Sequence, residues 1–181
     1  VYDPRTSATS YSTNPALCIR DYLTDTKYGF GASSSEIDDT SFTTASNICD
    51  ETVSLNAGGT ETKYTLNGTF ESNTTPKQTL ENLLTSMGGI VTYSNGKFKI
   101  KAAKYVSPTV TLDENHVIGA IGLQTNRSKR DNFNAVKGVF VTPDNNYISA
   151  DYPAFTSSTF QTEDGGDRAF LDLDLPFTTS V

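Results

Sequence analysis

Three stretches in the first part of the chain carry apolar residues at the three-to-four spacing of an amphipathic helix. The first begins at Asn14-Pro15, because asparagine caps free backbone amides and proline suits the first helical position. The second covers residues 39–53. The third begins at Thr75-Pro76 and ends at a Gly-Gly pair. Each stretch predicts a helix that buries one face.

A β-hairpin is predicted directly after the third helix. Two alternating runs, residues 90–93 and 97–101, flank an Asn-Gly pair, which is the strongest short-range hairpin signal. Its apolar face needs a partner, and the stripe of the preceding helix adjoins it in sequence, so we expect the two to pack together. The stripe consists of Leu80, Leu83, Leu84 and Met87, and the hairpin face consists of Val91, Tyr93, Phe98 and Ile100.

Strand patterns dominate the second part of the chain. The predicted strands cover residues 62–66, 117–123, 133–141, 147–150 and 168–175. Helices therefore come first, a helix-plus-hairpin unit lies in the centre, and strands come last. This order predicts an α+β fold whose strand-rich part is antiparallel. We expect residues 1–107 to form a helical and helix-hairpin domain and residues 108–181 to form a β-rich part.

The charge balance argues against a nucleic-acid-binding protein. The chain has 14 Lys and Arg against 21 Asp and Glu, a net charge of -7, and no stretch of it reads as a basic patch. Binding through counterion release needs cations clustered on one face. No apolar run approaches the roughly 20 residues that a membrane span requires. We therefore expect neither specific nucleic-acid binding nor a membrane span.

The residues predict no catalytic, cofactor or metal site. His116 is the only histidine, and it lies in a polar turn where we expect a surface or capping role, with a general base as the alternative. Cys18 and Cys49 lie on predicted helices beside apolar residues. We expect two buried thiols, and a bridge between the helices is the alternative. The acidic run 163–167 lacks the spacing of a calcium loop, so we expect a flexible acidic loop.

Several segments resemble the central hub, or tail-tip, proteins of siphophages and related prophages. They occur in the order of that family and cover nearly the whole chain. These segments are VYDPR, SYSTNPALCIRDYLTDTKYGFG, NICDETV, KYTLNGTFESNTTPKQTLENLLTSMGGIVTYSNGKFKIKAA, DNFNAVKGVFVTP and LDLDLPFTTS.

This resemblance implies a structural protein and not an enzyme. Such a hub is a homotrimer at the virion tail tip, assembled in the host cytoplasm, which joins the tail tube and other tail proteins to receptor-binding parts. It opens so that DNA passes, and a net charge of -7 would let a channel wall repel DNA phosphate. We expect the chain to be an internal segment, an inserted hub domain followed by a β-rich part that is incomplete at its C-terminal end.

Two other functions remain open at this level. A receptor- or glycan-binding module would use exposed aromatic side chains near polar loops, and the candidates are Tyr147, Tyr152, Phe155 and Phe160. A tail-associated cell-wall hydrolase would need paired carboxylates, which cannot be picked out from a sequence rich in Asp and Glu.

Overall fold

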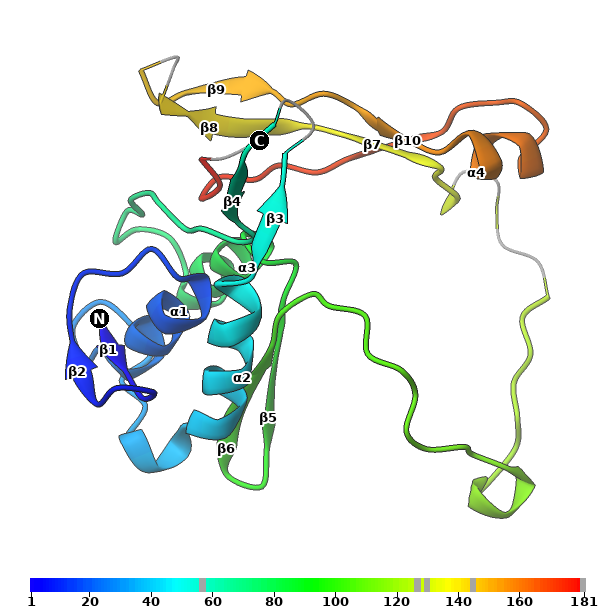
Figure 1. Cartoon of the computed structure of the whole chain (residues 1–181). Coiled ribbons are helices and arrows are strands. Elements are labelled where there is room, and N and C mark those ends of the chain that lie inside the picture. Colours follow the sequence, from blue (N-terminus) through cyan, green and yellow to red (C-terminus); the bar gives the residue numbers. More distant parts are fainter. Residues whose placement is uncertain (56–57, 126–127, 129–130, 144–145, 180–181) are drawn as a thin grey trace. The chain divides into compact units, whose positions relative to one another are not determined.

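The computed structural model describes residues 1–55, 58–125, 128, 131–143 and 146–179 of the chain (Figure 1). It has an α+β fold, which confirms the class that the sequence predicts. The described part contains four α-helices and several antiparallel strand pairs. No helix within these ranges is both long and apolar enough to span a membrane.

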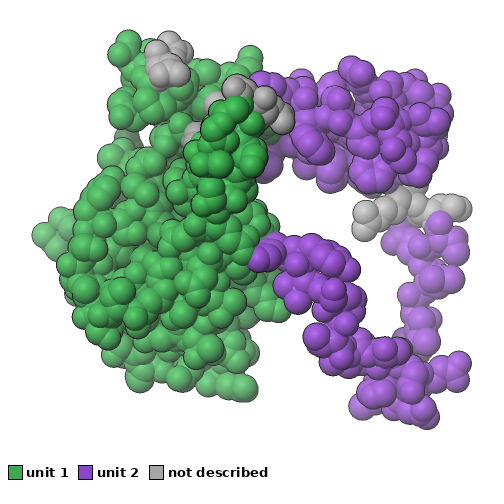
Figure 2. All heavy atoms as spheres, viewed as in Figure 1, with its two compact units in different colours: residues 1–103, 138–152, 174–181 green, residues 104–137, 153–173 purple. Residues whose placement is uncertain are grey.

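The chain divides into two compact units, coloured green and purple in Figure 2. Unit 1 contains residues 1–103, 138–152 and 174–181, and unit 2 contains residues 104–137 and 153–173. The sequence predicts a single boundary after residue 107. In the structure the chain first changes unit after residue 103. It then returns to unit 1 twice, because two segments of the predicted β-rich part belong to the first unit.

Helix α1 (Pro15–Thr24) begins where the sequence predicts. The Asn14 side chain accepts hydrogen bonds from two backbone amides of the first turn, and Pro15 occupies the first helical position. Ahead of the helix, the short strands β1 (Tyr2–Asp3) and β2 (Ala8–Thr9) pair antiparallel. The capping asparagine therefore fixes where the chain turns from this small ribbon into the helix.

Helix α2 (Asp39–Cys49) follows a short 3-10 helix (Ser34–Glu36) and is capped by Asp38, whose side chain accepts from the Ser41 amide. The helix is shorter than the predicted 39–53. Its last turn ends at Cys49 because the next residues pair as a strand instead.

That strand is β3 (Thr52–Ser54), which pairs antiparallel with β4 (Thr60–Thr62). Threonine and valine favour strands, since branching at Cβ suits a pleated surface better than a helix turn. The predicted strand at 62–66 is wrong in extent. The register with β3 ends at Thr62. Beyond it the backbone bonds to other segments: the Tyr64 amide donates to the Cys49 carbonyl at 3.2 Å, and the Leu66 amide donates to the Thr13 carbonyl at 2.8 Å.

Helix α3 (Pro76–Thr85) and the hairpin that follows are confirmed. The Thr75 side chain accepts from a backbone amide of the first turn of α3. Strands β5 (Ile90–Ser94) and β6 (Lys97–Lys101) pair antiparallel. The two turn residues, Asn95-Gly96, have φ of 54° and 72°, which are the positive values that a tight two-residue hairpin turn requires.

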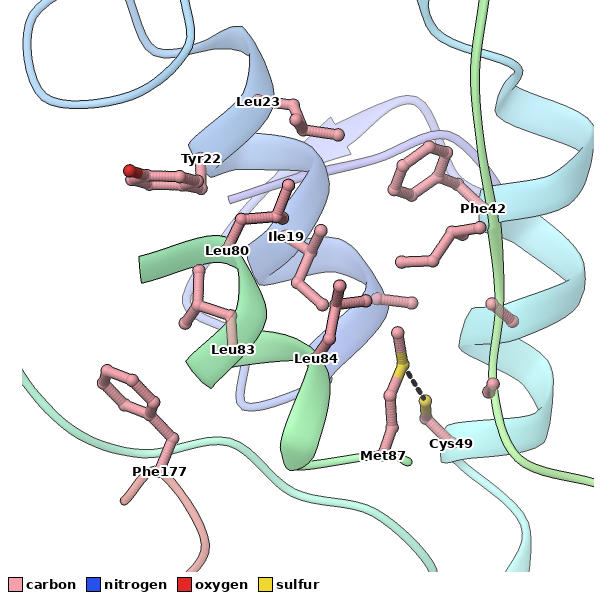
Figure 3. Packing of buried hydrophobic residues seen from close by; sticks show 14 of the residues in the cluster. Ile19, Tyr22, Leu23, Phe42, Cys49, Leu80, Leu83, Leu84, Met87 and Phe177 are labelled. Carbon is pink, nitrogen blue, oxygen red and sulfur yellow. Dashed lines mark hydrogen bonds between the residues drawn. The ribbon is translucent and has the colours of Figure 1, made fainter. Parts of the chain in front are cut away.

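The three helices and the hairpin of unit 1 share one hydrophobic core. Figure 3 shows side chains of α1, α2 and α3 pointing toward one another in this core. The buried cluster consists of Ala16, Ile19, Tyr22, Leu23, Ile37, Phe42, Ala45, Cys49, Leu80, Leu83, Leu84, Met87, Ile100, Ala102 and Phe177.

The expected packing of the α3 stripe with the hairpin is confirmed in part. The four stripe residues share the buried cluster with Ile100, and Val91 and Phe98 pack against that cluster. Helix α3 packs against α1, and strand β6 packs against α2. The reason is that α2 is tied to β6 by hydrogen bonds: the Asp38 amide donates to the Phe98 carbonyl at 3.0 Å, and the Ile100 amide donates to the Ser41 hydroxyl at 3.2 Å. Tyr93, expected in the packed face, is 57% exposed.

The predicted strand at 133–141 is split at Gly138. Its first part, β7 (Ala135–Lys137), belongs to unit 2, and its second part, β8 (Val139–Thr142), belongs to unit 1. Strand β8 pairs antiparallel with β9 (Ile148–Asp151), close to the predicted 147–150.

The C-terminal segment returns to unit 1 and closes its core. Leu175 forms a parallel bridge with Phe140, and the Phe177 ring is buried. A Cβ atom on Gly68 would lie 2.6 Å from the Phe177 ring, so this position requires glycine. The Asn67 amide donates to the Phe177 carbonyl at 3.0 Å, which holds the segment in place.

Unit 2 is built on a three-stranded sheet in which β7 is central. Strand β10 (Phe155–Thr156) pairs with it antiparallel, and β11 (Phe170–Asp172) pairs with it parallel. The parallel pair departs from the expected antiparallel pattern, because helix α4 (Ser158–Glu163) lies between β10 and β11 and reverses the chain. The apolar pattern of the sequence does not predict α4. The predicted strand at 168–175 shortens to the three residues of β11.

Candidate functional site

The N-terminal Tyr-Asp-Pro-Arg turn is held against α1 and α2 by a polar network in unit 1. Arg5 Nη2 lies 2.8 Å from Asp3 Oδ2, and Arg5 Nη1 lies 2.7 Å from Asp50 Oδ2. Asn14 Nδ2 donates to the other Asp50 oxygen at 2.8 Å. Three segments that carry the resemblance, VYDPR, the Asn-Pro helix start and NICDETV, therefore meet at one place in the structure.

A second contact joins the same turn to both helices. The Arg20 guanidinium lies 4.7 Å from the centre of the Tyr2 ring, and its Nε donates to Asp39 Oδ1 at 2.8 Å. Arg20 is buried, so these two partners compensate for the water that its guanidinium loses. The roles of Arg5 and Arg20 are missed by sequence reasoning, because their partners Asp50 and Asp39 lie far away along the chain.

The hydrogen bonds from Arg5 hold the pKa of Asp3 below its ordinary value. A carboxylate whose folded pKa is lowered stabilises the fold above its unfolded pKa, and this contribution is lost as the pH falls through the folded pKa. Replacing Asp3 with asparagine is therefore expected to lower the free energy of unfolding by about 1 kcal/mol at pH 7. The difference from the unaltered chain should narrow below roughly pH 4.

Urea denaturation at pH 7 and pH 3 measures this effect. The Asp151→Asn change, at an exposed position of β9, is the matched control and should change stability little at either pH. A loss on Asp3→Asn that is equally large at both pH values contradicts the ionic role of Asp3.

The most exposed apolar segment of the described chain is residues 104–125 of unit 2, which we call the arm (Figure 2). It forms no strand and pairs with none of the described strands. Eight of its large apolar side chains are from 47% to 102% exposed. They are Tyr105, Val106, Val110, Leu112, Val117, Ile118, Ile121 and Leu123. Contiguous exposed apolar surface usually marks an interaction site.

The predicted strand at 117–123 is wrong, because these residues lie in the arm without a neighbouring strand. Their apolar pattern suits a sheet, but backbone hydrogen bonds to a partner are what make a strand. Gly119 has a φ of 114°, a conformation that also interrupts a strand.

His116 has the capping role that the sequence predicts. It closes a short 3-10 helix (Glu114–His116) in the middle of the arm. Its Nδ1 lies 2.7 Å from Asp113 Oδ1 and 3.3 Å from the Asp113 amide nitrogen. The hydrogen bond from His116 also lowers the pKa of Asp113. The alternative role of a general base stays a prediction, because these contacts engage only Nδ1 of the ring.

The sheet of unit 2 has two unlike faces. On one face, Lys137 Nζ lies 3.6 Å from Asp172 Oδ1 and 5.6 Å from the centre of the Phe170 ring. On the other face, Val136 is the cross-strand neighbour of both Phe155 and Leu171. Phe155 is 74% exposed and Leu171 is 40% exposed. This second face therefore presents an apolar row across all three strands.

The acidic run at 163–167 borders a cavity of about 470 Å³ in unit 2. Asn134 Nδ2 donates to Asp164 Oδ2 at 2.8 Å and to the Asp167 carbonyl at 2.9 Å, and Asn134 Oδ1 accepts from the Ala169 amide. Asn134 thus contacts both ends of this stretch, and the expected flexibility of the acidic run stays a prediction. Within the described ranges, no group of three or more His, Cys, Asp or Glu side chains has an arrangement that could hold a metal ion.

The four candidate binding aromatics are divided between the units. In unit 1, Tyr147 precedes β9 and is 68% exposed, and Tyr152 follows β9 and is half-buried. In unit 2, Phe155 lies on β10 and Phe160, 58% exposed, lies on α4. Each unit therefore contains two of the four.

Both cysteines carry free thiols in this structure. Cys49 is buried in the core, where its Sγ lies 3.8 Å from Met87 Sδ (Figure 3), and Cys18 Sγ donates to the Ser12 carbonyl at 3.4 Å. Burial raises the pKa of each thiol to about 11. The expectation of a buried thiol is confirmed for Cys49, whereas Cys18 is half-buried, and the alternative of a bridge is not observed.

Comparison with models of known protein families and with curated protein sequences gave no match to this chain.

Proposed function

We propose that this chain is a structural subunit of a phage or prophage tail tip. In this proposal it forms part of a homotrimeric central hub in the virion, joins the tail tube to receptor-binding proteins, and performs no catalysis. Two lines of support come together. One is the ordered resemblance along nearly the whole chain, and the other is the arm.

The arm is the observation that carries the proposal. Its exposed apolar side chains, such as Ile118 and Leu123, gain free energy only when another surface removes them from water. A subunit that completes its packing in an assembly has such segments as a matter of course, because the partner supplies the missing layer. A hub made of several copies and bound to neighbouring tail proteins offers these partners.

The charge of the chain is compatible with a place beside passing DNA. A net charge of -7 repels phosphate, so a wall built from such subunits would let a genome slide past without adhering. The proposal therefore includes a contribution to the DNA-exit channel. Acidic side chains found only on the outside of the assembled ring would remove this support.

Immunogold labelling of purified phage particles tests the tail-tip assignment. Antibodies raised against this chain should label the end of the tail, opposite the capsid, in particles from the bacterium that carries the gene. Labelling at the capsid, or absence of the chain from purified particles, would overturn the assignment. Clearing of a peptidoglycan gel by the purified chain would instead favour a cell-wall hydrolase.

A receptor- or glycan-binding module is the second candidate, because Phe155 and Phe160 expose their rings in unit 2. Exposed aromatic rings stack on sugar faces through their apolar surface. Binding of the purified chain to a glycan array, lost in the Phe160→Ala variant and retained in Tyr11→Ala, would favour this function. Tyr11 is a suitable control because it is an exposed aromatic residue of unit 1.

A further inference from the structure

We infer that residues 106–112 of one copy of this chain add as a strand to the free edge of β11 in a second copy. The inference rests on the proposed function of an assembly subunit and names the contact by which copies join. It follows from the pattern of the arm, the free edge of β11 and the apolar face beside that edge.

The first half of the arm has the pattern of a strand that lacks a sheet. Val106, Pro108, Val110 and Leu112 alternate with the polar Ser107, Thr109 and Thr111. Val110 and Leu112 are 70% and 74% exposed, and no ladder joins the segment to any described strand. Strict alternation of this kind predicts a strand with one buried face.

Strand β11 lies at one edge of the sheet, and no other strand of the described part of the chain pairs with its outer side. The Leu173 amide donates to the Lys137 carbonyl at 2.8 Å, and the Ala169 carbonyl accepts from the Ala135 amide at 3.1 Å. In a parallel ladder, alternate residues face the partner strand. Residues 169, 171 and 173 therefore face β7, and the backbone groups of Phe170 and Asp172 point to the outer edge, where another strand can pair.

The other edge of the sheet is a poorer acceptor. Strand β10 has only two residues, Phe155 and Thr156, and it lies between Pro153 and the start of α4. Proline cannot donate to a ladder, and a helix start turns the backbone away. The edge formed by β11 and its flanking residues 169 and 173 is longer than the edge at β10. It is therefore the edge to which we assign the segment 106–112.

The apolar faces of the arm and the sheet match. Leu171 continues the row of Val136 and Phe155, and Leu173 lies two residues further along the same face. A strand added beside β11 places Val110 and Leu112 next to this row, so both apolar surfaces leave water together. Pro108 fits as well, because residues 107, 109 and 111 then direct their amides to β11 and leave the proline nitrogen on the new outer edge.

A second copy is the partner that the structure supports. Both halves of the contact, the unpaired arm and the open edge, belong to this one chain, yet within the described residues they do not pair with each other. The contact is heterologous, since an arm on one copy meets a different surface on the next. Contacts of this type close into rings when the rotation between copies allows it, and three copies satisfy every arm and every edge.

Substitutions on the two sides of the arm test its role. In Val110→Lys/Leu112→Lys the charges lie on the face that would be buried, and in the matched Thr109→Lys/Thr111→Lys they lie on the polar face. Sedimentation equilibrium of the full chain should give multiples of 19.6 kDa for the unaltered protein. The first variant should weaken association roughly 100-fold, because buried charges stay unpaired. The control should stay within about twofold.

A variant of the sheet tests the other half of the contact. Asp172→Pro removes an outward amide of β11 and leaves the hydrogen bonds to β7 in place, whereas Asp172→Ala keeps that amide and serves as control. Asp172→Pro should be monomeric and Asp172→Ala should associate. Mixing Asp172→Pro with Val110→Lys/Leu112→Lys should then yield heterodimers and nothing larger, because one intact arm meets one intact edge.

Three outcomes overturn the inference: an unaltered chain that is monomeric, equal loss of association in both arm variants, or a mixture that forms no heterodimer. Circular dichroism of each variant checks that it is folded. These results are separate from the tail-tip assignment, since immunogold labelling tests the location of the chain in particles and not the contact between copies.

Discussion

Replacing Phe42 with alanine is expected to lower the free energy of unfolding by about 3–5 kcal/mol. The Phe42 ring is fully buried in unit 1, where it extends from α2 into the core shared with α1 and β6 (Figure 3). Its removal takes away apolar contacts and leaves a cavity, because close-packed neighbours relax only in part. A loss of this size approaches the total stability of many domains.

Urea denaturation followed by far-ultraviolet circular dichroism measures this change. Phe160→Ala is the matched control, since the same atoms are removed from a ring that is 58% exposed on α4. We expect the control to change the free energy of unfolding by less than about 0.5 kcal/mol. A loss below about 1 kcal/mol for Phe42→Ala would mean that α2 does not bury this face.

Replacing Gly29 with alanine is expected to lower the free energy of unfolding by more than about 3 kcal/mol. A Cβ atom at this position would lie 1.9 Å from the Tyr22 carbonyl oxygen and 2.9 Å from the Asp25 carbonyl oxygen. Both oxygens belong to the backbone, so neither can move aside without disturbing the end of α1. The loop must therefore leave its place.

The loop around Gly29 closes the C-terminal end of α1. The Phe30 amide donates to the Tyr22 carbonyl at 3.1 Å, and the Ala32 amide donates to the Leu23 carbonyl at 2.8 Å. The Phe30 ring also makes an edge-on contact with Tyr22, with 6.0 Å between ring centres. Displacing the loop breaks these contacts and leaves buried carbonyl groups without donors.

Gly122→Ala is the control for this substitution. Gly122 has open space around its Cβ position and no positive φ, so alanine should be tolerated there. Thermal denaturation of both variants gives the comparison. A Gly29→Ala protein that melts together with the control would show that the loop adapts without cost.

The parts of the fold that follow from local chemistry are predicted well. Asn14-Pro15 and Thr75-Pro76 start helices as expected, and Asn95-Gly96 turns a hairpin as expected. In each case the residues that fix the backbone lie within a few positions of the element itself. The end of α2 is the exception. The β-branched residues Thr52 and Val53 pair with β4, which lies further along the chain, instead of continuing the helix.

Pairings between distant segments are predicted poorly. The packing of α3 on α1 and the parallel pair of β7 with β11 depend on residues far apart in the sequence. The network of Arg5 with Asp50 is missed for the same reason. The alternation of apolar and polar residues that begins at Val106 indicates a strand in the arm. An alternating pattern does not determine whether the segment finds a partner strand in its own chain.

The amino-acid sequence by itself thus determined the α+β class, the helix starts, the hairpin and the capping role of His116, because each depends on backbone chemistry within a few residues. The tertiary structure decided which faces meet, where the chain passes between its units after residue 103, and that residues 104–125 remain uncovered. These features depend on contacts between distant residues, whose free energies compete with one another and are settled only when the whole chain packs.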